Sequence, residues 1–312
     1  MDKITVIGAG NVGATCAMDI AHRGLCREVV MVDIKEGLAE GKALDMWQTS
    51  SINNFDTRIT GVTNDYAATA GSGIIVITSG LPRKPGMSRD DLIKTNADIV
   101  IGVTQKAVKH SPDAIIIVVS NPLDVMTYAA SKASGKPKNM VFGMAGILDM
   151  ARFKSHIAVS LDVSPNDVTT LLLGGHGDTM VPLPRFTSVN GIPLMDLMDN
   201  EEIDRIVART AGGGGEIVKL MGTSAWYAPG AGTALMVEAI VDDQKKIFPV
   251  STYLEGEFGL RDVFLGVPVK LGRNGIEEII EIKLNDEEMG MVKKSAEAVR
   301  SVMDVFDGLN LL

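Results

Sequence analysis

The sequence predicts an α/β protein in which a doubly wound parallel sheet is followed by an α+β substrate domain. Two observations support this prediction. Short apolar runs alternate with helical segments up to about residue 145, which is the pattern of a parallel sheet with helices on both faces. The alternation then stops, and hairpin-like pairs and long helical segments follow. We therefore expect one domain over residues 1–145 and a second over residues 146–312.

The composition is that of a globular protein large enough for two domains, with 312 residues of which 46% are hydrophobic and 22% charged. A formal net charge of -9 argues against nucleic acid as the main partner. No apolar run approaches the ~20 residues of a membrane span, and the first strand starts too close to Met1 for a signal peptide. The only cysteines, Cys16 and Cys26, do not indicate a disulfide framework, so we expect a cytoplasmic protein without a metal site.

The first apolar run leads directly into a glycine-rich turn. The run 5–7 is β-branched and predicts a buried strand, and residues 14–22 predict a helix. The motif GAGNVG stands between them. Its first glycine allows a tight bend, the second lets the backbone approach a pyrophosphate, and the third lets the helix pack closely on the strand. Free N–H groups at the helix start favour a bound phosphate. The cofactor contacts expected in this turn are Gly8, Gly10, Asn11, Val12 and Gly13.

An acidic residue closes the next predicted strand. Residues 29–32 form that strand, and Asp33 follows about 20 residues after the last glycine of the turn, as a dinucleotide-binding fingerprint requires. A carboxylate here can accept hydrogen bonds from both ribose hydroxyls and would repel a 2′-phosphate. The sequence therefore predicts a Rossmann-type domain that binds NAD rather than NADP. A glycine turn in some other α/β protein is the alternative.

Apolar periodicity predicts the remaining elements. In the first domain we expect strands at 57–62, 74–77, 114–119 and 140–142, and helices at 37–47, 89–110 and 123–134. In the second we expect a strand at 168–173, a hairpin at 185–194, helices at 201–220 and 233–246, and paired strands at 263–270 and 276–284. A capping box of Asn285 and Glu288 starts the last helix. The glycines 212–215 weaken helix 201–220 by roughly 1 kcal/mol each and could kink it. A phosphate loop is the alternative, but no strand precedes them.

His176 is the candidate catalytic base, because it stands in the loop GGHGD directly after an apolar strand. A carboxylate that fixes one ring nitrogen would favour the imidazolium and raise its pKa above ~6.5. Asp149 is the expected partner. Arg152 follows it by three residues, so the two share a helix face. The alternatives are a structural turn histidine and a surface ion pair.

Two further arginines, Arg83 and Arg89, stand in a proline-containing loop after the strand at 74–77. Asn121 ends the neighbouring strand at 114–119. A net-negative protein that directs several basic groups at one crevice implies an anionic substrate. An exposed basic loop and a plain turn are the alternatives.

Five stretches carry a resemblance to a known family: VIGAGNVG, TSGLPRKPGMSR, VSNPLDVMTY, GMAGILDMARF and LLLGGHGDTMVP. Together they are highly specific, and the likeness runs over essentially the whole chain. The sequence resembles the lactate/malate dehydrogenase family, and within it the lactate-dehydrogenase-like malate dehydrogenases. The resemblance implies reversible NAD-dependent oxidation of (S)-malate to oxaloacetate, a step of the tricarboxylic acid cycle. It also implies a homotetramer or homodimer. The charge and the apolar runs already indicate that neither nucleic acid nor a membrane is a partner.

The resemblance further implies a role for each candidate residue. His176 and Asp149 would form a proton relay, Arg89 would polarise the substrate carbonyl, and Arg152 would bind the neighbouring carboxylate. Arg83 would bind the distal carboxylate, at a position where lactate enzymes of the family tend to carry Gln. Further contacts are implied for Asn121 with substrate or cofactor, for Asn96 and Val119 with the cofactor, and for Ser224 as a pocket-lining residue.

Three other functions are weighed against this one. A lactate-type 2-hydroxy acid dehydrogenase would need an uncharged residue in place of Arg83. An NAD-using glycosidase would need a Cys/His metal site, for which the two cysteines are badly placed. An NAD-sensing regulator would explain the glycine turn and Asp33, but not the acidic and basic side chains together.

Overall fold

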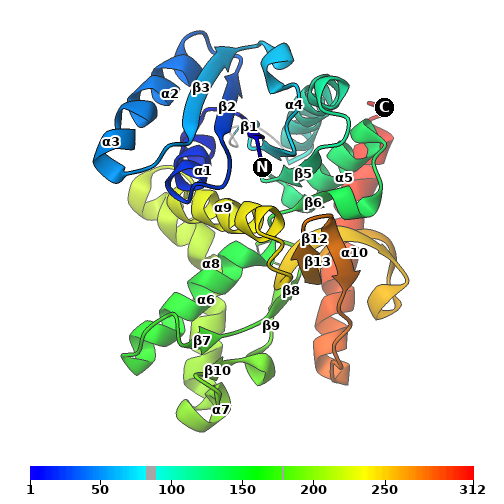
Figure 1. The fold of residues 1–312 in the computed structure, drawn as a ribbon. Helices are drawn as coiled ribbons and strands as arrows, with labels where there is room; N and C mark the ends of the chain where they lie inside the picture. The colour runs from blue at the N-terminus through cyan, green and yellow to red at the C-terminus, as the bar shows by residue number, and fades with distance from the viewer. Residues whose placement is uncertain (82–88, 178) are drawn as a thin grey trace.

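The computed structural model describes residues 1–81, 89–177 and 179–312; for Arg89 it describes the backbone but not the side chain (Figure 1). A large mixed sheet runs through this part of the chain, with helices packed on both faces. A smaller sheet lies at the lower end of the molecule in Figure 1. The predicted α/β fold class is confirmed.

The first half of the main sheet is parallel and doubly wound. Its strand order is β3-β2-β1-β4-β5-β6, so the winding reverses between β1 and β4. In open α/β sheets, ligands bind beside such a reversal, at the carboxyl ends of the strands. The bounds are β1 Lys3–Ile7, β2 Glu28–Asp33, β3 Arg58–Thr63, β4 Ile74–Ile77, β5 Ile115–Val118 and β6 Val141–Gly143.

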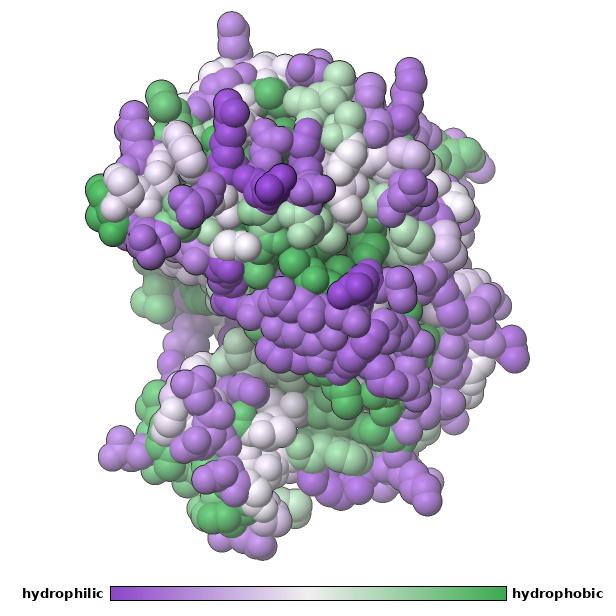
Figure 2. All heavy atoms as spheres, viewed as in Figure 1, coloured by the Kyte–Doolittle hydropathy of each residue, from purple (hydrophilic) through white to green (hydrophobic). Residues whose placement is uncertain are grey.

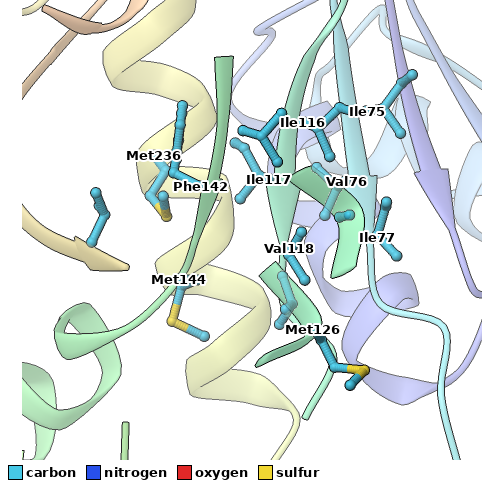
Figure 3. Packing of buried hydrophobic residues seen from close by; sticks show 14 of the residues in the cluster. Ile75, Val76, Ile77, Ile116, Ile117, Val118, Met126, Phe142, Met144 and Met236 are labelled. Atoms are coloured by element: carbon cyan, nitrogen blue, oxygen red, sulfur yellow. The ribbon is translucent and has the colours of Figure 1, made fainter. Parts of the chain in front are cut away.

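Strongly apolar, mostly β-branched sequences explain why these segments are strands. Every residue of β4 and β5 is buried, because helices cover both faces of the sheet. Figure 3 shows these side chains packed with Phe142 of β6 and with Met236 of α9 (Tyr227–Val241). This packing fixes the strand ends at which the candidate site lies.

Beyond β6 the main sheet continues in antiparallel fashion, in the order β12-β13-β8-β9, with β14 paired to β13. Ser251 of β12 pairs with Gly143 of β6, so one sheet joins the two halves of the chain. The bounds are β8 Leu172–Gly174, β9 Met180–Pro182, β12 Lys246–Glu255, β13 Arg261–Gly272 and β14 Gly275–Ile279. The small sheet consists of β7 Val168–Thr169, β10 Ser188–Val189 and β11 Ile192–Pro193.

The helices cover the sheet and present mostly polar surface to the outside. Figure 2 shows a largely hydrophilic face, with hydrophobic residues gathered near its middle. The long C-terminal helix α10 packs along β8, β9 and β13. The bounds are α1 Asn11–His22, α2 Leu38–Gln48, α3 Ser50–Asn53, α4 Arg89–His110, α5 Leu123–Ser134, α6 Gly146–Leu161, α7 Leu194–Leu197, α8 Asn200–Met221, α9 Tyr227–Val241 and α10 Asp286–Gly308.

Several predicted elements are confirmed at or near their expected bounds. The helices at 89–110 and 123–134 coincide with α4 and α5. The hairpin turn is present, with φ of 47° at Asn190 and 87° at Gly191, the positive values that a type I′ turn requires. The capping box of Asn285 and Glu288 is present at the start of α10.

Two predictions in the second half are wrong. The strand expected at 168–173 is split, because β7 pairs within the small sheet while β8 pairs with β9 and β13. The helix expected at 233–246 ends at Val241, since Asp243 and Lys245 both adopt positive φ. The ten-residue strand β12 that follows was missed. Its Pro249 argues against a central strand in sequence, but in the fold it stands opposite Pro268 of β13.

The glycines 212–215 lie within α8, which the structure describes as one helix from Asn200 to Met221. The expected kink is not observed in this described segment, and the glycines adopt helical rather than turn conformation. Tertiary packing explains why the helix continues, because Ile203, Ile206 and Gly213 bury one face of α8 against the second half. The alternative, that residues 212–215 form a phosphate-binding loop, is therefore wrong.

Candidate active site

The glycine turn lies at the reversal between β1 and β4. Gly8 has φ of +107°, and a Cβ added there would lie 2.6 Å from Thr78 Oγ1. A Cβ on Gly13 would lie 1.9 Å from the Gly8 carbonyl oxygen, because α1 packs directly on the turn. A Cβ on Gly10 would meet no heavy atom of the described chain within 4 Å. The turn is therefore closed on its protein side and open at Gly10, as a phosphate-binding turn requires.

Asp33, at the end of β2, is tied to this turn. Its Oδ2 accepts a hydrogen bond from the Ala9 N–H at 2.7 Å, and its Oδ1 accepts one from the Lys35 N–H at 2.9 Å. A carboxylate offers about four acceptor positions, so two of them are left over by these contacts. The side chain is only half-buried. Its position fits the predicted contact with a ribose.

Asn96 of α4 links the segments that follow β4 and β5. Its Oδ1 accepts a hydrogen bond from the Leu81 N–H at 2.8 Å, and its Nδ2 donates to the Asn121 carbonyl at 2.7 Å. Asn96 is buried, so its amide serves to hold Asn121 in place. Its predicted contact with a cofactor stays a prediction.

His176, Asp149 and Arg152 form one hydrogen-bonded group. His176 Nδ1 lies 2.9 Å from Asp149 Oδ2, and Arg152 Nη1 donates to Asp149 Oδ1 at 3.1 Å. The Asp149 side chain is only 1% exposed, so the alternative of a surface ion pair is wrong. Because a carboxylate oxygen only accepts, Nδ1 of the histidine carries a proton and Nε2 is left for another partner.

The surroundings of His176 favour its charged form. Burial acts to lower the pKa of the imidazole, but the hydrogen bond and charge of Asp149, together with the charge of Asp124, outweigh burial and the opposing charge of Arg152. The pKa of His176 is therefore raised above its ordinary value. An imidazole of this kind can hold a proton near neutral pH and release it to an acceptor.

A cavity of about 400 Å³ opens beside this group. Residues from both halves of the chain line it: Val12, Val119, Asn121, Arg152, His176 and Ser224. The fold therefore brings expected cofactor-binding residues and expected catalytic residues to one space. Small molecules bind in cavities of this size when a few polar groups converge on an otherwise apolar lining.

The glycine run of α8 forms part of the same lining through Gly212, Gly214 and Gly215. Gly213 is buried, and a Cβ added there would lie 3.0 Å from Arg152 Cδ and 3.4 Å from Arg152 Nε. Arg152 Nε is itself buried and has no hydrogen-bond partner in the part of the chain that the structure describes. The helix thus lies close against the arginine because Gly213 has no side chain.

Asp124, in the first turn of α5, is a further residue of the site that was not expected from the sequence. Its Oδ2 accepts a hydrogen bond from the His176 N–H at 3.1 Å, and its Oδ1 accepts one from Ser251 Oγ at 2.6 Å. Asp124 is buried. The only signal in the sequence is an acidic residue at a helix start beside Asn121, which a helix-dipole contact explains equally well.

Two expected site residues cannot be placed in this way. Arg83 lies outside the described residues. Arg89 begins α4, but its side chain also lies outside the description.

Cys16 and Cys26 are free and buried. Among the residues described, no helix is long and apolar enough to cross a membrane, and no group of three or more His, Cys, Asp or Glu side chains could hold a metal ion.

Family models match nearly the whole chain. The model for the lactate/malate dehydrogenase NAD binding domain matches residues 2–143, and that for the lactate/malate dehydrogenase alpha/beta C-terminal domain matches residues 147–307. A malate dehydrogenase from Cytophaga hutchinsonii is 61% identical over 307 residues, which is 98% of this chain and 98% of that protein. One from Salinibacter ruber is 61% identical over 302 residues, 97% of this chain and 96% of that protein.

Solved structures agree with these matches. The structure of malate dehydrogenase from Salinibacter ruber superposes with a TM-score of 0.95 at 58% identity, covering 98% of both chains. The lactate dehydrogenase from Cryptosporidium parvum, in complex with lactic acid and nicotinamide adenine dinucleotide, superposes with a TM-score of 0.93 at 36% identity, again over 98% of both chains.

Proposed function

The chain belongs to the lactate/malate dehydrogenase family, and from this premise we propose that it catalyses the reversible NAD-dependent oxidation of (S)-malate to oxaloacetate. The observation that carries the proposal is the buried Asp149 held between His176 and Arg152, beside a cavity that Val12 of the glycine turn also lines. This arrangement combines a proton acceptor, a carboxylate-binding group and a cofactor turn.

The residues of the first half fit NAD. Gly10 leaves open space where a pyrophosphate would approach, and the start of α1 supplies free N–H groups. Asp33 retains acceptor positions for ribose hydroxyls, and its charge opposes a 2′-phosphate. When bound, NAD supplies the hydride acceptor. The predicted contacts of Asn11, Val12, Asn96, Val119 and Asn121 with it are part of this proposal.

His176 moves the proton of the reaction. In malate oxidation, neutral Nε2 takes the proton of the C2 hydroxyl, and Asp149 stabilises the imidazolium that results. In oxaloacetate reduction, the imidazolium returns that proton to the carbonyl oxygen. Reduction therefore requires the protonated histidine and oxidation the neutral one. As pH rises through the raised pKa of His176, the rate of reduction should fall and the rate of oxidation should rise.

Guanidinium groups bind the carboxylates of the substrate. Arg152 faces the cavity with its fork fixed by Asp149, and a planar fork suits bidentate binding of a carboxylate. We assign it the carboxylate next to the reacting carbon. By resemblance, Arg89 polarises the carbonyl and Arg83 binds the distal carboxylate.

The competing function is a lactate-type 2-hydroxy acid dehydrogenase, because the family includes enzymes of both names. Oxaloacetate and pyruvate differ by one carboxylate, so kcat/KM for the two acids with NADH separates the functions. We expect oxaloacetate to be preferred, and Arg83→Gln to lower its kcat/KM by about two to four orders of magnitude while raising that of pyruvate. A wild-type preference for pyruvate would refute the malate assignment. An unchanged ratio in the variant would show that another group binds the second carboxylate.

The proposal extends to organisation and location. We place the domain boundary near residue 145, and we propose a homo-oligomer, tetramer or dimer, that acts in the cytoplasm in the tricarboxylic acid cycle. The two free, buried thiols suit a reducing compartment. Exposed Leu44, Trp47 and Ile52 along α2 and α3 suit contact with another copy. Sedimentation velocity on the purified protein tests the assembly.

A further inference from the structure

We propose that Asp124 is a positioning residue for the catalytic histidine, one that holds the His176 loop against the cofactor-binding half and keeps the imidazolium favoured through its own negative charge. This inference rests on the proposed function, since it assigns Asp124 a part in the same proton transfer. It concerns a carboxylate that the proton relay of His176 and Asp149 does not include.

The contacts of Asp124 fit a carboxylate that accepts hydrogen bonds on both of its oxygens. One oxygen accepts the backbone N–H of His176 at 3.1 Å, and the other accepts the hydroxyl of Ser251 at 2.6 Å. A backbone N–H can only donate, so that oxygen carries no proton in this arrangement. The carboxylate also lies in the first turn of α5, where free N–H groups and the helix dipole stabilise a negative charge.

The position of Asp124 ties three elements together. α5 starts at Leu123, two residues after Asn121, which lines the cavity, while His176 belongs to the loop after β8 and Ser251 to β12. On the other side of the loop, Ser295 of α10 accepts the Gly175 N–H at 2.8 Å and donates to the Thr179 carbonyl at 2.7 Å. The loop is therefore held from two sides, by a charged group on α5 and a neutral one on α10.

The charge of Asp124 matters because of what else faces His176. α6 contributes Asp149 and Arg152, and α5 contributes Asp124, whereas β12 and α10 contribute only the hydroxyls of Ser251 and Ser295 among the described contacts. Among the described side chains, these two carboxylates and one guanidinium leave one negative charge, which the imidazolium neutralises. Without Asp124, the charges of Asp149 and Arg152 would cancel, and the imidazolium of His176 would be stabilised much less.

Burial gives this charge its effect. Asp124 is 7% exposed, so water screens its interaction with the imidazole only weakly. On balance burial raises the pKa of Asp124, and the hydrogen bonds from Ser251 and His176 act against this rise and favour the carboxylate.

Asp124→Asn separates charge from position. An Asn can accept the His176 N–H through its oxygen and donate its amide to the Ser251 hydroxyl, so the contacts persist while the charge is lost. The measurement is an NMR pH titration of the imidazoles in the unliganded protein. The chain has four histidines, and the resonance of His176 is the one that disappears in His176→Asn. We expect the midpoint of His176 to fall by about half a unit or more in Asp124→Asn.

Ser251→Ala is the matched control, because it removes one contact of Asp124 and keeps the carboxyl group. Its His176 midpoint should shift much less than that of Asp124→Asn. Asp124→Ala should lower kcat at least about tenfold with the NADH dissociation constant unchanged, and Asp124→Asn should restore part of that loss.

Three outcomes would overturn the proposal. An unshifted midpoint in Asp124→Asn would remove the role of the charge, and equal kcat values for Asp124→Ala and the wild type would remove the role in positioning. Should Asp124→Asn not fold, a wild-type midpoint at or below the ordinary value of ~6.5 would refute the charge role by itself. None of these results depends on the ratio of oxaloacetate to pyruvate turnover, so failure here is distinct from failure of the malate assignment.

Discussion

The turn at Gly8–Gly13 and the run at Gly212–Gly215 both contribute to the lining of one cavity, and they use glycine for different reasons. In the turn, Gly8 and Gly13 are required by the protein itself, because a Cβ at either position would collide with neighbouring protein atoms. In α8 the backbone is an ordinary helix, and Cβ atoms at Gly212 and Gly215 would meet no heavy atom of the described residues within 4 Å.

The difference shows that a glycine-rich sequence has no single meaning. The role of each glycine depends on what an added Cβ would meet. It would meet backbone at Gly13, open space at Gly10 and the side chain of Arg152 at Gly213. Backbone cannot yield without moving a strand or a helix, whereas an arginine stem can shift by a few tenths of an ångström. Alanine scanning of the two segments should therefore give three separate classes of effect.

The largest effect is expected for Gly13→Ala. The new methyl group would lie 1.9 Å from the Gly8 carbonyl oxygen, so α1 must move away from the turn. Overpacking of this kind should lower the free energy of unfolding by about 3 kcal/mol, and NADH binding should be lost with it. Urea unfolding followed by circular dichroism measures the loss. A variant as stable as the wild type would mean that α1 does not pack on the turn as described.

A smaller and more selective effect is expected for Gly10→Ala. The same chemical change here meets no described atom within 4 Å, so the stability should stay within about 0.5 kcal/mol of the wild type. The methyl group would instead occupy the approach of the pyrophosphate, and the dissociation constant of NADH should rise about tenfold or more. Fluorescence titration with NADH tests this. Should Gly10→Ala bind NADH normally, the pyrophosphate does not approach at Gly10.

The two regions also differ in how far the sequence revealed them. The glycine turn, Asp33 and the strands around them are local, because a motif of six residues and the flanking apolar runs contain all the information. The partnership of His176 with Asp149 depends on residues 27 positions apart, and it was expected from loop chemistry and resemblance rather than from spacing.

The contacts that the sequence did not reveal depend on still longer separations. Asp124 meets Ser251 across 127 positions, and Gly175 meets Ser295 across 120. No periodicity or motif links such positions. β12 was missed for a related reason: Pro249 argues against a strand in isolation, and only its pairing opposite Pro268 makes the strand possible.

The smallest effect is expected for Gly213→Ala, and it gives the sharpest test of the comparison. The added methyl group would lie 3.0 Å from Arg152 Cδ, so the arginine stem must shift slightly while Asp149 still holds one end of its guanidinium. A displacement of a few tenths of an ångström should raise KM for oxaloacetate about fivefold, with a smaller change in kcat.

The free energy of unfolding of Gly213→Ala should rise, since Ala is favoured over Gly in a helix by up to about 1 kcal/mol. Gly290→Ala is the matched control. It makes the same change in α10 at an exposed position, where a Cβ would meet no heavy atom of the described residues within 4 Å. It should therefore raise the free energy of unfolding and leave KM unchanged. If both variants give the same KM, Gly213 does not position Arg152. A rise in KM confined to Gly213→Ala would identify the run as packing space for the arginine.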